Sequence, residues 1–335
     1  MSKKIRNITL IICCLPVFAC TDNLSTNRPY ILATATTGGT YYPVGVALAT
    51  ITKAQLYESK GLSLSAISSA GSMENIKLMR DNQAQFAIIQ GIFGPWGWHG
   101  DGPISRPQPW MRTICALWQN TDHFVLEKEL AGDGSIMAID RLDGQRFVLG
   151  ARNSGAERSG DHILSSLGID YASRVNLAYM NYGATANAIQ DGTIVGMNVP
   201  AGVPVTAITR AFAMVGERLT LLSFTDEQLA QVNATYPIWT RHTIPGGTYP
   251  NLPETIQSIS HPNVLVVRAD IPDDDVYEIT KAIFDNLASL NEIHKATREV
   301  TLEKALTGLG VPLHPGAARY FREQGIDIPT ELTPP

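Results

Sequence analysis

The sequence lacks the signatures of common catalytic and cofactor-binding proteins. A Walker loop, a Gly-x-Ser-x-Gly elbow, an HExxH helix and a Rossmann glycine fingerprint are all missing. The seven histidines are scattered, and none pairs with another at the spacing of metal ligands. We therefore expect no resident cofactor or metal, and the common hydrolases and nucleotide-dependent enzymes are disfavoured.

Positive charge is also scarce. The net charge is −5 and no stretch is rich in Lys and Arg, which argues against a nucleic-acid partner. Low-complexity tracts are missing after residue 29, so we expect a folded chain. About 310 mature residues exceed the usual size of one hydrophobic core, so two domains are the default expectation.

Long apolar runs are missing except near the N-terminus. Three basic residues among the first six precede an apolar run from Ile8 to Phe18, which is too short to span a bilayer permanently. This layout predicts a secretory signal over residues 1–20. The run ends in Val17-Phe18-Ala19-Cys20, which resembles a bacterial lipobox and would make Cys20 a lipidated first residue. Ordinary cleavage after Ala19 is the alternative.

The few cysteines fit an exported protein. The polar residues 21–29 are typical of a tether. If Cys20 carries a lipid, Cys115 is left alone and no disulfide can form; a bridge from Cys20 to Cys115 is the alternative. We predict a periplasmic or otherwise extracytoplasmic protein that meets the membrane only through a lipid anchor.

Units of strand, small-residue loop and helix recur along the chain. The strand Tyr30–Ala35 runs into the loop Thr36–Pro43, and a helical apolar pattern follows. The strand Leu62–Ile67 and the loop Ser69–Ser72 repeat the pattern, as do a strand, loop and helix over residues 147–167. This alternation predicts an α/β fold.

Two extended apolar segments separate clusters of these units. They are His123–Glu127 and Asn263–Arg268, and we interpret them as the paired crossings of a hinge. The pattern predicts two lobes. Lobe I would consist of residues 30–122 and 264–335, and lobe II of the inserted residues 123–263.

The glycine-rich segment Gly91–Gly97 resembles a phosphate loop only superficially. Its glycine spacing is wrong, and Pro95 removes a backbone donor. We expect a tight aromatic loop packed at a lobe surface.

Loops of small residues before helices are suited to holding an anion. Small side chains let a ligand approach the backbone, and the first N–H groups of a helix are unpaired donors. One such loop is weak evidence, because every βα unit has a connection. Several such loops that converge on one cleft would hold an anion, and they are stronger evidence than one loop without being decisive.

Five segments carry a resemblance to a known family. In chain order they are Gly38–Pro43, Ser69–Ser72 with Asn75, Asn153–Glu157, Ile244–Tyr249 and Val311–Gly316. Together they resemble the TAXI family of TRAP-transporter solute-binding subunits over nearly all of the mature chain. The resemblance implies a type II periplasmic-binding-protein fold and a small anionic solute, such as glutamate or another carboxylate. It also implies TRAP membrane subunits as partners.

The resemblance also implies a set of ligand contacts. Carried over position by position, they fall on Gly39, Thr40, Tyr42, Ser72, Asn75, Gln90, Ser154, Gly155, Pro200, Ala201 and Gly202. Arg152 is a further candidate, because it places a cation just before the third loop. It would either pair with a ligand carboxylate, remain a solvated cation at the cleft rim or form a salt bridge between the lobes.

The third loop departs from the family pattern. Asn153-Ser154-Gly155-Ala156 stands where the family often has Gly-Ser-Gly-Thr, so one hydroxyl is lost. The departure leaves the identity of the ligand open, but it does not affect the expected fold. Two rival functions also stay open: an enzyme on the same architecture, and a receptor that reports its ligand to a signalling partner.

Overall fold

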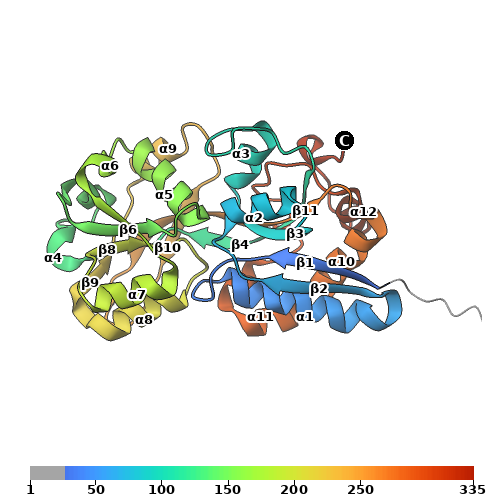
Figure 1. Ribbon diagram of the computed structural model, residues 1–335, viewed down its shortest axis with the longest axis horizontal. Helices are drawn as coiled ribbons and strands as arrows, with labels where there is room; N and C mark the ends of the chain where they lie inside the picture. The colour runs from blue at the N-terminus through green and yellow to red at the C-terminus, as the bar shows by residue number, and fades with distance from the viewer. Residues whose placement is uncertain (1–26) are drawn as a thin grey trace, which may run out of the picture.

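The structure is a computed structural model that describes residues 27–335, arranged as two α/β lobes side by side (Figure 1). The predicted signal, Cys20 and residues 21–26 of the predicted tether lie outside the described residues, whereas Arg28 and Pro29 belong to the first strand and not to a tether. None of the helices in residues 27–335 is both long and apolar enough to span a membrane. The predicted two-lobed α/β architecture is confirmed.

Lobe I is built from both ends of the described chain. Its first part contains β1 (Arg28–Ala33), α1 (Tyr41–Lys60), β2 (Leu62–Ile67), α2 (Ser72–Arg80), β3 (Phe86–Gln90), α3 (Phe93–His99) and β4 (Met111–Thr121). Its last part contains α10 (Asp273–Asp285), α11 (Leu287–Ile293), η3 (Lys295–Glu299), α12 (Pro315–Glu323) and η4 (Thr330–Leu332).

The chain enters lobe II directly after β4. Its first half contains β5 (Phe124–Glu127), α4 (Lys128–Ala131), η1 (Ile136–Arg141), β6 (Arg146–Gly150), α5 (Gly155–Ser166), α6 (Tyr171–Arg174) and β7 (Asn176–Tyr179). Its second half contains α7 (Tyr182–Gln190), β8 (Gly196–Asn198), α8 (Thr206–Val215), η2 (Gly216–Arg218), β9 (Leu219–Leu221), α9 (Asp226–Val232) and β10 (Thr240–Ile244). The long strand β11 (Ile256–Arg268) then returns to lobe I.

The strands form two sheets, the first mainly in lobe I but extended by β10 of lobe II, and the second within lobe II. The first sheet has the order β10-β11-β3-β1-β2, with β4 paired to β11; β1 is parallel to β2 and β3, and β11 is antiparallel to its neighbours. The second has the order β7-β6-β8-β5-β9, with β6 parallel to β7 and β8. The parallel core places the ends of several strands, and the helix starts after them, at one edge.

Strand β11 connects the two lobes. Its C-terminal half pairs with β3 and its N-terminal half pairs with β10. Ile244 and Ile256, at the far end of that second pairing, pack into an apolar core together with residues of α7 and α8. We propose that lobe II comprises residues 123–263, with hinge crossings between β4 and β5 and within β11.

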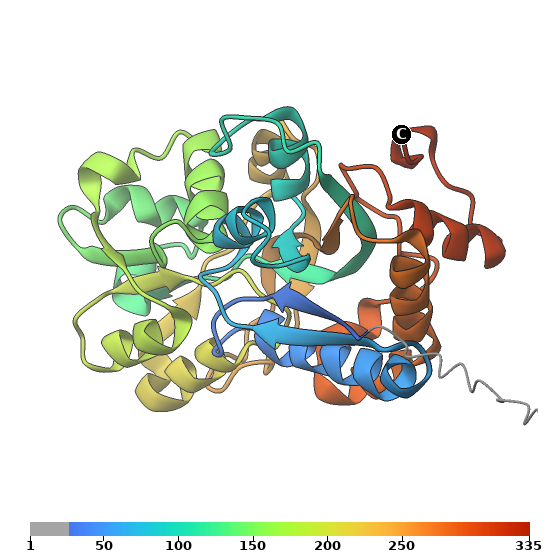
Figure 2. The same cartoon turned by 45° about the vertical axis from the view of Figure 1, so that its right-hand side comes forward.

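Helices cover both faces of the first sheet. Helices α1, α10, α11 and α12 pack on one face through a shared core, and Figure 2 shows α1 running along β2. Helix α10 begins directly after Pro272 and carries three aspartates in its first turn, as its sequence predicts, because acidic side chains favour the positive end of a helix. Its buried face carries Val276, Ile279 and Ile283.

The segment Gly91–Gly97 differs from its expectation. Residues 93–99 form helix α3 rather than a surface loop, and Phe93 and Trp96 are buried against the second core. Gly97 lets α3 pack closely against Met111 at the start of β4, since a Cβ at residue 97 would lie 2.7 Å from Met111 Cε. The aromatic side chains therefore belong to the core.

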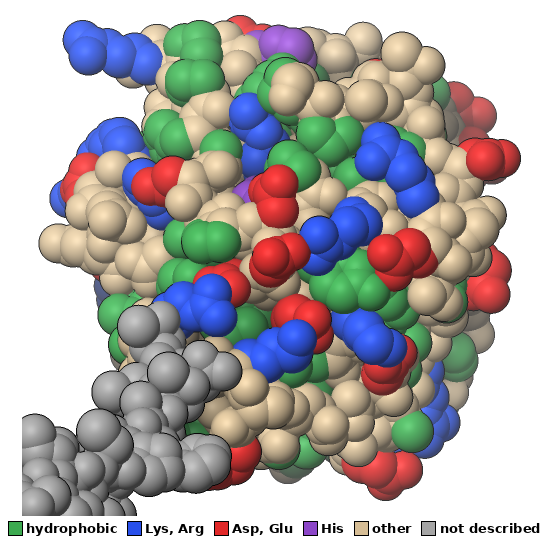
Figure 3. Space-filling model, turned by 90° about the vertical axis from the view of Figure 1, so that its right-hand side faces the viewer, with side chains coloured by type: hydrophobic (Ala, Val, Ile, Leu, Met, Phe, Trp, Pro, Cys, Tyr) green, Lys and Arg blue, Asp and Glu red, His purple; other side chains and the backbone are tan. Residues whose placement is uncertain are grey.

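The end of lobe I opposite lobe II carries interspersed charges of both signs (Figure 3). Ion pairs join Lys60 to Glu278 and Arg319 to Asp274, with shortest N–O distances of 2.7 and 2.9 Å. Exposed pairs of this kind contribute little stability. Neither sign of charge dominates this face.

Candidate functional site

A cavity lies between the lobes and is lined by residues of both. It encloses about 460 Å³ of empty space, including its open mouth. The lining consists of Ala35, Thr36, Gly39, Thr40, Tyr41, Ala70, Gly71, Ser72, Gln90, Ala151, Ser154, Gly155, Ala156, Asn181, Tyr182, Pro200 and Ala201. These residues come mainly from four strand-to-helix connections, two in each lobe.

Four helices begin at the wall of this cavity. The first residues of α1, α2, α5 and α7 are Tyr41, Ser72, Gly155 and Tyr182, and all four line it. A first-turn N–H group has no partner within its own helix. None of these four N–H groups has a hydrogen-bond partner among the described residues. The cavity is therefore surrounded by unpaired backbone donors.

Caps in the connecting loops satisfy other donors but not these four. Ser154 Oγ accepts from Glu157 N at 3.1 Å, and Asn181 Oδ1 accepts from Ala184 N at 2.9 Å. Such caps define where each helix begins. They leave the first N–H of α5 and of α7 available to a ligand.

The helix starts face each other in pairs across the cleft. A Cβ built on Gly71, just before α2, would lie 3.7 Å from Gly155 N at the start of α5. A Cβ on Gly38, before α1, would lie 3.3 Å from Gly183 N in the first turn of α7. Each helix start carries a partial positive charge, so each pair brings like charges together.

The two lobes are in contact around the cavity. Gly202 N donates to Thr40 Oγ1 at 3.2 Å, and Thr40 Oγ1 donates to Gly202 O at 3.4 Å. Thr40 makes no side-chain capping bond within its own loop. The structure is thus a closed form, in which Thr40 links lobe I to the segment after β8.

No charged side chain stands among the described residues that line the cavity. Burial raises the pKa of Tyr41 and of Tyr182 above the ordinary tyrosine value, so both phenols stay neutral. The wall presents hydroxyls, amides and backbone N–H groups. Residues 27–335 also contain no group of three His, Cys, Asp or Glu side chains that could hold a metal ion.

The structure brings together most of the residues singled out from the sequence. Eight of the twelve line the cavity: Gly39, Thr40, Ser72, Gln90, Ser154, Gly155, Pro200 and Ala201. Ser72 Oγ also accepts from Gln90 N at 3.0 Å, and Gln90 Oε1 is buried without a partner among the described residues. Their role in ligand contact stays a prediction.

Three others lie outside the lining. Tyr42 faces a separate surface hollow between α1 and α11. Asn75 is fully buried, and its amide donates to the carbonyls of Thr34 and Ile88 at 2.7 and 2.8 Å, which ties β1 to β3. Gly202 contacts Thr40 rather than the cavity.

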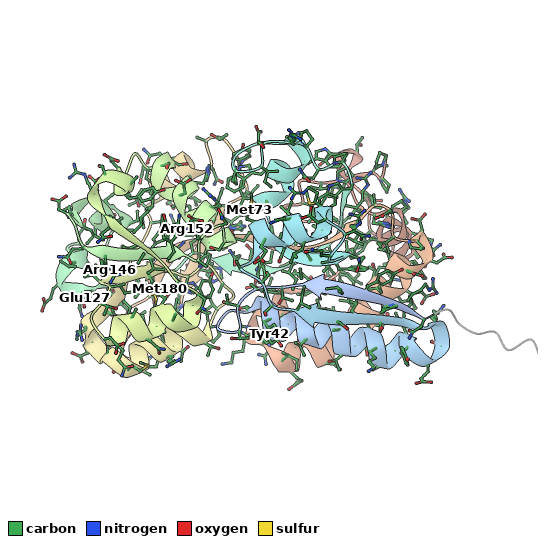
Figure 4. All side chains as sticks on the ribbon, in the orientation of Figure 1. Tyr42, Met73, Glu127, Arg146, Arg152 and Met180 are labelled. Atoms are coloured by element: carbon green, nitrogen blue, oxygen red, sulfur yellow. The ribbon has the colours of Figure 1, made fainter. Side chains whose placement is uncertain are left out.

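Arg152 is also outside the lining. Figure 4 shows it on the side of lobe II that faces lobe I, in which Met73 and Tyr42 are labelled. The Arg152 guanidinium carbon lies 3.9 Å from the centroid of the Tyr179 ring, a stacked cation–π arrangement. No ion pair of Arg152 is formed within the described part of the chain. The structure thus favours a cation at the rim over an interlobe salt bridge.

The fourth helix start at the cavity was not singled out from the sequence as part of the site. Asn181 and Tyr182 line the cavity, and Tyr182 OH donates to Pro200 O at 2.9 Å. The available signal was Asn181, a favoured N-cap residue that follows an apolar strand. The residues between β7 and α7 are Met180 and Asn181, and they include no Gly, Ser or Thr, so this connection did not match the other three.

Solved structures with similar folds share this two-lobed organisation. A protein of Bordetella bronchiseptica RB50 matches with a TM-score of 0.52 and 13% identity, covering 91% of both chains. MatC of Rhodopseudomonas palustris with bound malate matches at 0.52 and 12%, covering 89% of this chain and 96% of that one. PhnD1 of Prochlorococcus marinus in complex with methylphosphonate matches at 0.51 and 12%, covering 89% and 99%.

The two lobes and the cavity between them form a fold of the periplasmic-binding type. The family can be stated as well. A model of the NMT1-like family matches residues 32–325, and the chain belongs to that family.

Proposed function

We propose that the protein is an extracytoplasmic receptor that captures a small organic anion between its lobes and delivers it to TRAP membrane subunits. The observation that carries the proposal is the set of four unpaired first-turn N–H groups, from Tyr41, Ser72, Gly155 and Tyr182, around one uncharged cavity. Helix N-termini favour anions through both their free donors and their dipoles.

An anion would also explain why the lobes close. Closure brings the starts of α2 and α5 together, and likewise those of α1 and α7. Like partial charges repel, and a bound anion between them replaces that repulsion with attraction. The ligand therefore favours the closed form through its differential affinity for it.

The available donors are sufficient in energy. A micromolar ligand needs about 8 kcal/mol of net binding free energy. A hydrogen bond to a charged group contributes about 1.5–3 kcal/mol, so four converging donors supply much of the gross attraction before association costs. An arginine in contact with the anion is not required.

An enzyme on the same fold would need a proton acceptor beside a nucleophile. The described lining offers the hydroxyls of Thr40, Ser72 and Ser154, but no carboxylate or imidazole. This composition supports a binding role. The TAXI resemblance supports the TRAP partner, and the N-terminal sequence supports export with a lipid on Cys20. Mass spectrometry that finds an unmodified N-terminus on the native protein would reject the lipid.

A thermal-shift screen followed by calorimetry tests the proposal. L-glutamate, L-malate and methylphosphonate represent an amino acid, a dicarboxylate and a phosphonate. At least one small anion is expected to raise the melting temperature, since a ligand that binds only the folded state stabilises it. The proposal fails if no anion does so and none co-purifies. Uptake of the bound anion by cells with and without the protein then separates transport from signalling.

Thr40 and Arg152 are expected to differ in importance. Thr40→Val removes both hydrogen bonds to Gly202, which join the two lobes in the closed form. We expect affinity for the anion found in the screen to fall about five- to tenfold, since each bond contributes about 0.5–1.5 kcal/mol. Arg152→Ala should change it less than threefold, because this side chain stacks on Tyr179.

Calorimetry on the two variants and the parent protein checks this expectation. Thr40 caps no backbone group of α1, so the helix start is not disturbed by the substitution. A larger loss for Arg152→Ala than for Thr40→Val would show that the arginine pairs with the ligand.

A further inference from the structure

A fully buried histidine stands where the chain first crosses between the lobes. His123 lies between β4 and β5, and its Nδ1 is 2.9 Å from Thr121 O and 3.0 Å from Val199 O. Both oxygens only accept, so Nδ1 carries the proton. Nε2 is then the acceptor in its 2.8 Å contact with Tyr249 OH. Tyr249 belongs to the Ile244–Tyr249 segment, which supplies no residue to the cavity wall.

Of these two carbonyls, Val199 O belongs to the segment that forms part of the cavity wall, and Thr121 O ends β4 beside it. Thr121 and Ala201 exchange backbone hydrogen bonds of 2.9 and 3.0 Å, and Val199 N donates to His123 O at 3.0 Å. Pro200 and Ala201 line the cavity. His123 therefore holds the first hinge crossing and the adjacent wall segment together.

Tyr249 extends this network into lobe II. Its hydroxyl accepts from Val205 N at 3.3 Å while it donates to His123. Its ring packs at right angles to His123 and stacks on Phe212 of α8. Both ends of the segment 199–205 are thus hydrogen-bonded to one His–Tyr pair.

We propose that His123 and Tyr249 are positioning residues for the solute cavity: they fix residues 199–202, which form part of its wall and meet Thr40 on closure. This inference rests on the proposed function. The pair itself does not touch the cavity, so its effect on a ligand is transmitted through the backbone of this segment.

The neutral form of His123 suits this role. Burial lowers its pKa to about 4, partly offset by the hydrogen bonds to Val199 and Thr121, and the nearby His242 lowers it slightly. The ring is therefore uncharged near neutral pH, with one donor and one acceptor. Each of them has a partner in the structure.

Tyr249→Phe tests the proposal with little change in volume. It leaves the His123 acceptor and Val205 N without their partner, which loosens the segment locally. We expect hydrogen exchange at the amides of Val199 and Ala201 to accelerate about tenfold or more. The amide of Thr34, bonded to Ile67 O at 3.0 Å in lobe I, is the internal reference and should not change.

Tyr171→Phe is the matched control. It also removes a tyrosine hydroxyl bond in lobe II, to Asp161, but Tyr171 has no contact with the wall segment and does not line the cavity. Hydrogen exchange at the amides of Val199 and Ala201 in Tyr171→Phe should be as slow as in the parent protein. If exchange in Tyr249→Phe accelerates equally at all amides, the pair only stabilises the fold in general, and the inference is wrong. Unchanged exchange at Val199 and Ala201 would also overturn it.

Binding supplies the second readout, with L-glutamate as the first probe. If the parent protein binds it, Tyr249→Phe should release it about tenfold faster, and Tyr171→Phe at the parent rate. Equal release from all three proteins contradicts the positioning role but not the proposed function. If no anion binds the parent protein, the proposed function fails, while hydrogen exchange still decides whether the pair fixes the segment.

The ring nitrogen signals of His123 give an independent check. Nitrogen-15 NMR near neutral pH should show a neutral ring protonated at Nδ1. Protonation at Nε2 instead would contradict the hydrogen-bond network from which the role is inferred. His123→Asn keeps a donor close to the Nδ1 position, so it should retain more protection at Val199 than His123→Leu does.

Discussion

Gly155→Ala is expected to weaken anion binding between tenfold and a hundredfold without weakening the ligand-free fold. A Cβ at this position would lie 2.7 Å from Ser72 Oγ, 3.0 Å from Ser72 Cβ and 3.2 Å from Gln90 Nε2, all in the other lobe. Overpacking costs about 1–3 kcal/mol, and each 1.4 kcal/mol is a factor of ten in affinity. The clash exists only when the lobes are closed.

The expectation is specific because Gly155→Ala should weaken ligand binding but should not lower the stability of the ligand-free protein. Gly155 is the first residue of α5, and alanine favours a helix over glycine, so the open form should be equally stable or slightly more stable. Ser72 cannot simply turn away, because its Oγ already accepts from Gln90 N. Small-angle scattering should show that Gly155→Ala keeps the larger radius of the open form when anion is added.

Gly183→Ala provides the control. Gly183 is also in the first turn of a cavity helix, but its added Cβ would meet nothing closer than Asn181 Oδ1 at 3.6 Å. Affinity should stay within about twofold of the parent protein. Equal affinity in Gly155→Ala and Gly183→Ala would mean that the ligand-bound lobes are farther apart than in this structure.

Local periodicity was enough to predict the architecture. The alternation of strands and helices and the extended segments His123–Glu127 and Asn263–Arg268 are visible in the sequence, and the structure has strands at both segments, whose role as hinge crossings stays a prediction. Each depends on residues close in the chain. The burial of Phe93 and Trp96 was not predictable in this way, because it depends on a core built from both lobes.

The site was predicted less completely, because a side chain's direction depends on helix phase. Successive helical residues point about 100° apart, so Tyr41 lines the cavity while its neighbour Tyr42 faces a different hollow. Asn75 is one turn beyond the start of α2, and its side-chain amide donates to the carbonyls of Thr34 and Ile88 instead of lining the cavity. Motif order along the chain identifies a loop but not which of its side chains enters the cleft.

Asp122→Asn is expected to stabilise the protein at pH 8 and to leave it unchanged near pH 4. Asp122 is fully buried, and the hydrogen bond from Trp239 Nε1 to Oδ2, at 3.2 Å, is its only side-chain bond among the described residues. Burial raises its pKa to about 8, with Trp239 opposing the shift. The folded protein therefore keeps this carboxyl protonated where the unfolded chain ionises it.

The direction of the pH dependence follows from proton binding. Between about pH 4 and pH 8 the unfolded state holds fewer protons at this residue than the folded state does, so the free energy of unfolding falls as the pH rises. The loss begins above the unfolded pKa and is complete above the folded one. One pKa unit corresponds to 1.36 kcal/mol, so the total is on the order of a few kcal/mol. Asparagine has the shape of the protonated acid and avoids this loss.

Denaturant unfolding of both proteins from pH 4 to pH 8 measures the effect. Taking the difference between variant and parent removes the contribution of titrating groups that both proteins share, such as the buried His123 and His261. Asp270→Asn is the control of opposite sign: Arg268 lowers the pKa of this largely exposed carboxyl, so its loss should slightly destabilise the protein above pH 4. If Asp122→Asn instead destabilises the protein at pH 8, the carboxylate is ionised there, and its free Oδ1 has a partner, such as a water molecule or a cation.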